Sequence, residues 1–186
     1  MKRKLIKNCL IIGIIILLAS LATHAIYYKF HENRGVDYSS KSLEVVFHEE
    51  NGNKITLDKA VPLTDNLGLA SNSYTFSVTN NLTEDVPLKI KLVRDKVAFE
   101  EDKCKEIPAK YLKVSIKENN KKNVMHLVTE LKDEVLLDTN IKALKNNNYT
   151  VRIWTTQDFD STDTNLHYHG ELQVIENDNL LAMNRR

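Results

Sequence analysis

Short stretches in which apolar and polar residues alternate recur between residues 43 and 176, and they constrain the fold more than any other feature of the sequence. An alternation with a period of two places successive side chains on opposite faces of a strand. The clearest stretches carry apolar side chains at these alternate positions: Leu43, Val45 and Phe47; Tyr74, Phe76 and Val78; Leu88, Ile90 and Leu92; Leu112, Val114 and Ile116; Tyr149, Val151 and Ile153. With a last strand at 166–176, about eight short strands are expected. This pattern is typical of an all-β fold, an antiparallel β-sandwich of jelly-roll or immunoglobulin-like type with one face of each sheet buried.

The connections between these strands are less regular. The Asn-Gly pair within Glu50–Asn53 predicts a hairpin that joins the first strand to a short second strand at 54–58. Residues 124–131 and 133–138 are further candidate strands, the second of them ambiguous, and 96–110 is predicted to be a longer connection with a helical turn. No long helical pattern interrupts the strands, which argues against a βαβ fold.

An apolar run near the N-terminus follows a basic cluster, which consists of Lys2, Arg3, Lys4 and Lys7. The run Cys9–Ala22, extended to Tyr28, has about 20 residues, and at 1.5 Å per residue it just spans a hydrocarbon core of roughly 30 Å. We therefore expect a single transmembrane helix at 9–28. Because most of the positive charge precedes the run, the positive-inside rule places the N-terminus in the cytoplasm and the rest of the chain outside.

The predicted anchor divides the chain into five parts: a cytoplasmic basic region at 1–8, the transmembrane anchor at 9–28, a linker at 29–40, an extracytoplasmic β-sandwich domain at 41–177 and a tail at 178–186. A cleaved signal peptide is the alternative, because Cys9–Ala22 also has the length of a signal-peptide core. Small residues at Ser20–Ala22 and Thr23–Ala25 would suit a signal peptidase. In that case the protein would be secreted instead of remaining in the cell membrane.

Charge and cysteine content exclude several classes of protein. The 26 Lys and Arg residues nearly balance the 25 Asp and Glu residues, so the chain lacks the basic excess of a nucleic-acid-binding protein. The two cysteines, Cys9 and Cys104, cannot form an intrachain disulfide if Cys9 lies in a membrane, because bridged Cα atoms sit within about 7 Å. An exterior domain without a disulfide fits a Gram-positive cell surface better than a small secreted animal module.

Two segments of the outer chain look familiar. Residues 57–93 contain a Pro-x-Thr-Asp loop, the strand "YTFSVTN", a turn and what is expected to be its paired strand, and 148–175 contain "YTVRIW", an acidic loop and a final "GELQV" strand. These segments resemble anchored or secreted proteins of Gram-positive bacteria, the nearest named group being the TasA/camelysin matrix proteins. The resemblance implies a jelly-roll-like β-sandwich. Its motifs are structural, so it implies no site residues.

Two groups of side chains are candidate metal ligands. His167 and His169 lie two residues apart on the last predicted strand, so both imidazoles share a face, although a zinc site usually needs three or four protein ligands. The acidic loop at 157–165 carries three carboxylates of a kind that can bind calcium: Asp158, Asp160 and Asp163. The spacing does not match an EF-hand. A solvated strand face and a solvated acidic loop are the simpler interpretations, and no cofactor is expected.

Catalytic motifs are not apparent in the sequence. The segment His48–Gly52 begins like a zinc-protease motif but lacks its second histidine, and there is no Gly-x-Ser-x-Gly turn. Cys104 has no motif around it and is predicted to be structural or incidental. Trp154 lies on the face opposite Tyr149 and Val151, and we expect it to pack against a sheet edge or a loop. The alternative is an exposed aromatic ring for a partner or a polysaccharide.

These observations predict a membrane-tethered, extracytoplasmic β-sandwich protein for surface interaction or assembly, without catalysis. Its expected partners are the membrane, through residues 9–28, and another protein or further copies of itself. Three alternatives stay open: a secreted matrix or fibre subunit released by signal-peptide cleavage, a metal-dependent secreted hydrolase, and an accessory subunit of a membrane complex.

Overall fold

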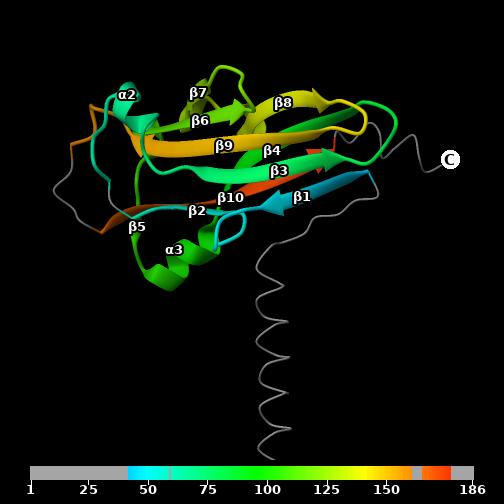
Figure 1. Ribbon diagram of the computed structural model, residues 1–186. Coiled ribbons are helices and arrows are strands. Elements are labelled where there is room, and N and C mark those ends of the chain that lie inside the picture. Colours follow the sequence, from blue (N-terminus) through cyan, green and yellow to red (C-terminus); the bar gives the residue numbers. More distant parts are fainter. Residues whose placement is uncertain (1–41, 59, 161–164, 177–186) are drawn as a thin grey trace, which may run out of the picture. The chain divides into compact units, whose positions relative to one another are not determined.

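The computed structural model describes residues 42–58, 60–160 and 165–176, all of which belong to one compact unit at Val36–Arg186 (Figure 1). The predicted basic region at 1–8, anchor at 9–28, linker at 29–40 and tail at 178–186 lie outside the described residues. Within the described ranges, no helix has the length and apolar character that a membrane crossing requires.

Two sheets, whose neighbouring strands along each path run antiparallel, form a β-sandwich, as the alternation predicts. The first sheet has the order β1-β3-β9-β6-β7 and consists of β1 (Leu43–Phe47), β3 (Tyr74–Asn80), β9 (Asn146–Thr155), β6 (Leu112–Glu118) and β7 (Val124–Leu127). The second has the order β2-β10-β4-β8 and consists of β2 (Lys54–Leu57), β10 (Leu166–Glu176), β4 (Val86–Arg94) and β8 (Val135–Ile141). The two-residue strand β5 (Lys105–Glu106) joins this sheet by pairing in parallel with the start of β10.

The core lies between the two sheets and is made by the apolar face of each strand. The alternate residues of β1 are buried there, and Phe76 and Val78 of β3 are fully enclosed, whereas Tyr74 is partly buried against the same core. Aromatic rings form the centre of the first sheet's inner face: the ring centroids of Phe47 and Phe76 are 5.3 Å apart, and those of Phe76 and Tyr149 are 5.1 Å apart. The single-face alternation is therefore confirmed.

The predicted hairpin at Glu50–Asn53 is wrong. Asn51 and Gly52 do form a tight turn, in which Gly52 has a φ of 63° and Lys54 donates a backbone hydrogen bond to Asn51. However, β1 pairs with β3 and β2 pairs with β10, so the turn carries the chain from one sheet to the other. The residue types of a turn determine its local backbone angles, whereas the choice of strand partner depends on packing across the whole sandwich.

The expected pairing of β3 with β4 is also wrong, because β3 pairs with β1 and β9 whereas β4 pairs with β10 and β8. The chain therefore crosses between the two sheets a second time, between β3 and β4. Asn80, the last residue of β3, stabilises this crossing. Its buried side-chain amide donates to the carbonyl oxygens of Glu84 (2.8 Å), Ile141 (3.2 Å) and Lys142 (3.2 Å), and its oxygen accepts from Leu82 N (2.9 Å). One side chain thus joins the end of the first sheet to the end of the second.

Short helices occupy the connections: α2 (Asp65–Gly68), α3 (Lys96–Asp102), and the 3₁₀ turns η1 (Ala109–Tyr111), η2 (Val128–Glu130) and η3 (Lys132–Glu134). The helical turn expected within 96–110 is α3. The strand expected at 124–131 stops at Leu127, because Glu130 accepts a hydrogen bond from the Leu127 N–H (3.1 Å) and the chain turns into η2. The ambiguous segment at 133–138 contributes to η3 and β8.

Trp154 is fully buried on the outer face of the first sheet, so the alternative of an exposed aromatic ring is wrong. The short helix α2 covers the indole, and a Cβ atom built on Gly68 would lie only 2.3 Å from Trp154 Cδ2. Thr64 caps this helix by accepting a hydrogen bond from Leu67 N (3.2 Å). Trp154 is the only tryptophan of the chain. Its fluorescence should therefore change when the packing of α2 against the indole changes.

Candidate functional site

The most distinctive group of polar side chains lies on the outer face of the second sheet, at the start of β10. Tyr168 points into the core and is buried, so the flanking His167 and His169 point outward on the same face. Their ring centroids are 6.0 Å apart. The sequence prediction that the two imidazoles share a face is correct.

The helix α3 turns this stretch of outer face into a partly buried site. Its Phe99 ring packs edge-on against His169, with ring centroids 4.9 Å apart, and His169 is only 5% exposed. The Arg94 guanidinium lies over the Phe99 ring, 5.0 Å from its centroid. A histidine on the outer face of a sheet is thereby buried almost as fully as a core residue.

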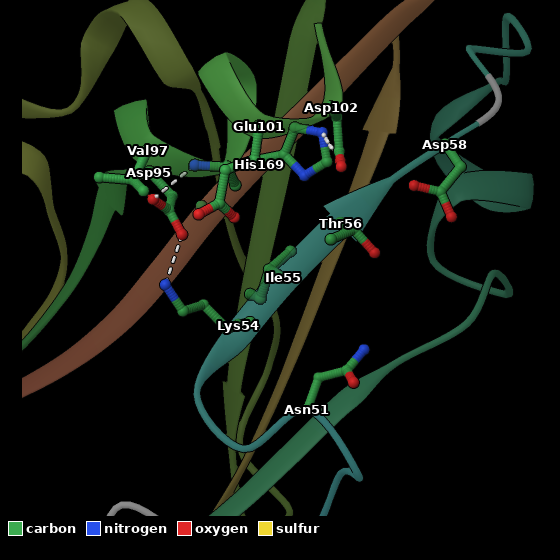
Figure 2. A pocket seen from close by; sticks show the side chains of 12 residues that line it. Asn51, Lys54, Ile55, Thr56, Asp58, Asp95, Val97, Glu101, Asp102 and His169 are labelled. Carbon is green, nitrogen blue, oxygen red and sulfur yellow. Dashed lines mark hydrogen bonds and ion pairs between the residues drawn. The ribbon is translucent and has the colours of Figure 1, made fainter. Parts of the chain in front are cut away.

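Asp95 determines where α3 begins. Its carboxylate caps the helix by accepting from Ala98 N (3.2 Å), its backbone N–H donates to His169 O (3.0 Å), and it forms an ion pair with Lys54 (Figure 2). The hydrogen bond from Lys54, together with that from Ala98, holds the pKa of the Asp95 carboxyl below its usual range. The capping and the pairing together fix the N-terminal end of α3 to β2 and β10.

The far end of α3 returns the chain to β10. Lys103 has a φ of 51°, in the left-handed region in which helices commonly end. Cys104 follows directly, and β5 then pairs with β10 so that Glu106 lies opposite His167. This parallel pairing is the reason that Cys104 reaches the two histidines.

Three atoms of different residues converge at the end of α3. Cys104 Sγ lies 3.4 Å from His169 Nε2, and Asp102 Oδ2 lies 3.3 Å from the same nitrogen. The potential ligand atoms of Cys104, His167 and His169 all lie within 4.8 Å of one another. Figure 2 displays His169 and Asp102 facing each other beside β2.

An open pocket of about 510 Å³ adjoins this group. Its lining carries one basic residue, Lys54, and four acidic residues: Asp58, Asp95, Glu101 and Asp102. Lys54 is engaged by Asp95, so the remaining carboxylates make the pocket attractive to a cation. Burial raises the pKa of the Cys104 thiol, and the charge of Asp102 raises it further.

Glu171, on the same strand, and the three aspartates of the acidic loop are the other carboxylates to consider. Glu171 shares the outer face of β10 but accepts a hydrogen bond from Asn53 Nδ2 (2.8 Å) and is not a member of the group. Asp158 and Asp160 are exposed, and within the part of the chain that the structure describes they belong to no convergent ligand group. Asp163 lies outside the described residues.

Sequence reasoning missed Cys104 and Asp102. The spacing of two between the histidines is a local signal, whereas Cys104 precedes His169 by 65 residues along the chain. Their proximity depends on the parallel pairing of β5, a strand of only two residues. No sequence periodicity marks a strand so short.

Comparisons with known proteins identify no relative by sequence. No protein-family model matches this sequence, and no curated protein matches it. The P-domain of Macrobrachium rosenbergii nodavirus aligns over 76% of this chain and 96% of its own, with 11% identity and a TM-score of 0.26. TmCBM61, solved in complex with β-1,4-galactotriose, aligns over 75% of this chain and 85% of its own, with 12% identity and a TM-score of 0.24.

A third structure is AvmM, which catalyses macrocyclization in alchivemycin A biosynthesis. It aligns over 70% of this chain and 93% of its own, with 11% identity and a TM-score of 0.23. At TM-scores this low, the three alignments provide no information about the function of this chain.

Proposed function

We propose that this protein is a membrane-tethered, extracytoplasmic β-sandwich that binds a protein partner or further copies of itself, and that it does not catalyse a reaction. The observation that carries the proposal is the outer strand β7. An outer strand presents backbone hydrogen-bonding groups with which another chain can pair, and natural proteins usually protect such edges with charged residues or proline.

β7 contains no charged residue and no proline of its own. The strand reads Val-Met-His-Leu, and Val124 and Met125 are 39% and 42% exposed. The other three strands at the ends of the two sheets each carry a charged residue: Glu44 in β1, Lys54 in β2 and Asp138 in β8. β7 is therefore the outer strand on which addition of a further strand meets the least electrostatic resistance.

The hydrogen bonds around β7 indicate where an added strand would pair. Leu127 donates its N–H to the Glu130 side chain and not to β6, which lies on the other side. Because backbone groups two residues apart point in the same direction along a strand, the N–H of Met125 also points to the outer edge. Met125 lies opposite Ser115 of β6, in the middle of the paired segment.

The edge proposal is tested by the variant Met125→Lys in the full-length chain, purified in detergent or embedded in nanodiscs. A lysine on the edge is expected to weaken self-association or partner binding by about tenfold or more, since the ammonium must be desolvated when a strand is added. Sedimentation velocity measures self-association, and cross-linking on intact cells detects a partner.

Val61→Lys is the matched control for the edge variant. Val61 is 56% exposed and lies outside the strands, so the added charge there should leave association unchanged. A wild-type chain that is monomeric at the highest concentration and is cross-linked to nothing on cells would refute the proposal. Equal effects of the two lysines would refute the role of β7.

The tether is tested separately, by the intact mass of the protein and the fraction in which it is found. We expect a chain that begins at Met1 in the membrane fraction, because the apolar run at 9–28 contains many Ile and Leu residues, each contributing roughly −0.3 to −0.6 kcal/mol to insertion. A mature protein that begins at Thr23 or Ile26 and is found in the medium would contradict the anchor. It would favour a secreted matrix subunit instead.

A further inference from the structure

Going beyond the proposed function, we propose that Cys104, His167, His169 and Asp102 bind a zinc ion, which fastens the connection between β4 and β6 onto the outer face of β10.

The group around His169 Nε2 is poorly explained by hydrogen bonds alone. A neutral imidazole nitrogen either donates one proton or accepts one. If Nε2 carries the proton and donates it to Asp102, it cannot accept from the Cys104 thiol. If it accepts from the thiol, its lone pair faces the Asp102 carboxylate, 3.3 Å away. A cation placed among the three atoms interacts favourably with all of them at once.

The distances fit a tetrahedral zinc site. With Zn–N and Zn–O bonds of about 2.0 Å and a Zn–S bond of about 2.3 Å, ligand atoms of one tetrahedron lie about 3.3 Å apart for nitrogen and oxygen and about 3.5 Å apart for nitrogen and sulfur. The corresponding distances are 3.3 Å from Asp102 to His169 and 3.4 Å from Cys104 to His169. The ligand atom of His167 lies within 4.8 Å of those of Cys104 and His169, and it would have to move closer to them to complete the set. Asp102 is placed in the set by its distance to His169 alone.

The types of ligand select the metal. A thiolate and two imidazoles suit zinc, whereas calcium and magnesium prefer oxygen ligands throughout. Binding converts the Cys104 thiol to a thiolate and releases its proton to water.

The ligands come from two segments that the ion would join. His167 and His169 lie on β10, whereas Asp102 and Cys104 lie at the end of α3 and just after it. The contacts that hold this connection to the sheet without an ion include the Phe99 contact, the Asp95 interactions and two backbone pairs of β5. Zinc would therefore stabilise this connection locally and leave the core between the sheets unchanged.

The test uses the full-length chain in detergent, stripped of metal by a chelator and titrated with Zn²⁺ in competition with a chromophoric chelator. We expect one equivalent of tightly bound zinc. With Co²⁺ as the probe, a thiolate-to-metal charge-transfer band and the d–d bands of a tetrahedral site should appear.

Three ligand variants identify the site. Cys104→Ser and His167→Gln are expected to weaken zinc binding by about 100-fold or more, the upper end of what loss of a supporting residue costs. Cys104→Ser should also abolish the charge-transfer band. Asp102→Asn should weaken binding by about tenfold or more, because its side chain is 55% exposed and water can replace it.

Matched controls use the same residue types elsewhere. Cys9→Ser removes the only other thiol, His126→Gln removes a histidine of β7, and Glu100→Gln removes an exposed carboxylate of α3. All three should bind zinc like the wild type. Binding that is weakened equally by Cys9→Ser, or that survives Cys104→Ser unchanged, would overturn the proposal, as would the absence of stoichiometric zinc.

A second readout does not depend on the variants folding equally well. In the wild-type chain, zinc should slow backbone hydrogen exchange at 96–106 and leave exchange in β6 unchanged, because Asp102 and Cys104 lie within the former segment and no ligand lies in β6. Uniform protection of both segments, or of neither, would also overturn the proposal. The association measured with Met125→Lys is independent of these results.

Discussion

Replacing Trp154 by alanine is expected to lower the free energy of unfolding by about 3–5 kcal/mol, the range for deletion of a large buried aromatic side chain. The indole is fully buried between β9 and α2, and its removal leaves a cavity that the short helix cannot fill. Urea denaturation followed by far-UV circular dichroism measures the loss. A change below about 1 kcal/mol would mean that α2 does not cover the ring.

The same contact makes a second variant informative. Gly68→Ala introduces a methyl group that would lie 2.3 Å from the Trp154 ring, so we expect it to cost about 1–3 kcal/mol through overpacking. In the Trp154→Ala background the methyl group enters the cavity, and the added cost should nearly vanish. Additive effects of the two substitutions would contradict the direct contact, because independent sites add and touching sites do not.

Asn80→Ala is expected to cost about 3 kcal/mol or more, because it leaves the Leu82 N–H and the carbonyl oxygens of Glu84, Ile141 and Lys142 without the Asn80 side chain. Asn80→Asp is expected to cost more than this near neutral pH. The amide that donates to three carbonyl oxygens would become a carboxylate facing them, at a position that is only 1% exposed.

The aspartate variant should also depend on pH in a defined direction. Burial would raise the folded-state pKa of the new carboxyl above its unfolded value of about 3.9. The variant therefore loses stability as the pH rises from the unfolded-state pKa through the folded-state pKa. The gap between Asn80→Asp and the wild type should therefore widen from pH 4 to pH 8, while that of Asn80→Ala stays constant. Asn81→Asp, at an exposed neighbour, is the control. A pH-independent gap for Asn80→Asp would be inconsistent with a buried amide at this crossing.

Some of these structural features could be predicted from the sequence and others could not. The inward faces of β3, β4, β6 and β9 follow from alternation alone, because a strand with one apolar face must bury it against something. The covering of Trp154 by α2 was not evident, since the sequence gives no reason for a four-residue helix to fold back over β9. The position of Asn80 could be placed at the end of a strand, but its three carbonyl partners come from segments up to 62 residues away.

The sequence by itself determined the all-β class, the inward face of each principal strand and the shared face of His167 and His169, because each depends on neighbours within about ten residues. Only the tertiary structure decided which strands pair. Asn51 and Gly52 form the predicted turn, yet the chain crosses between sheets there, because burying the apolar faces of both sheets together determines the partners. The meeting of Cys104 with His169 has the same origin. Cys104 lies near His169 because β5 forms two backbone pairs with β10. Pairing between segments so far apart in the sequence produces no periodic pattern of apolar residues from which it could be predicted.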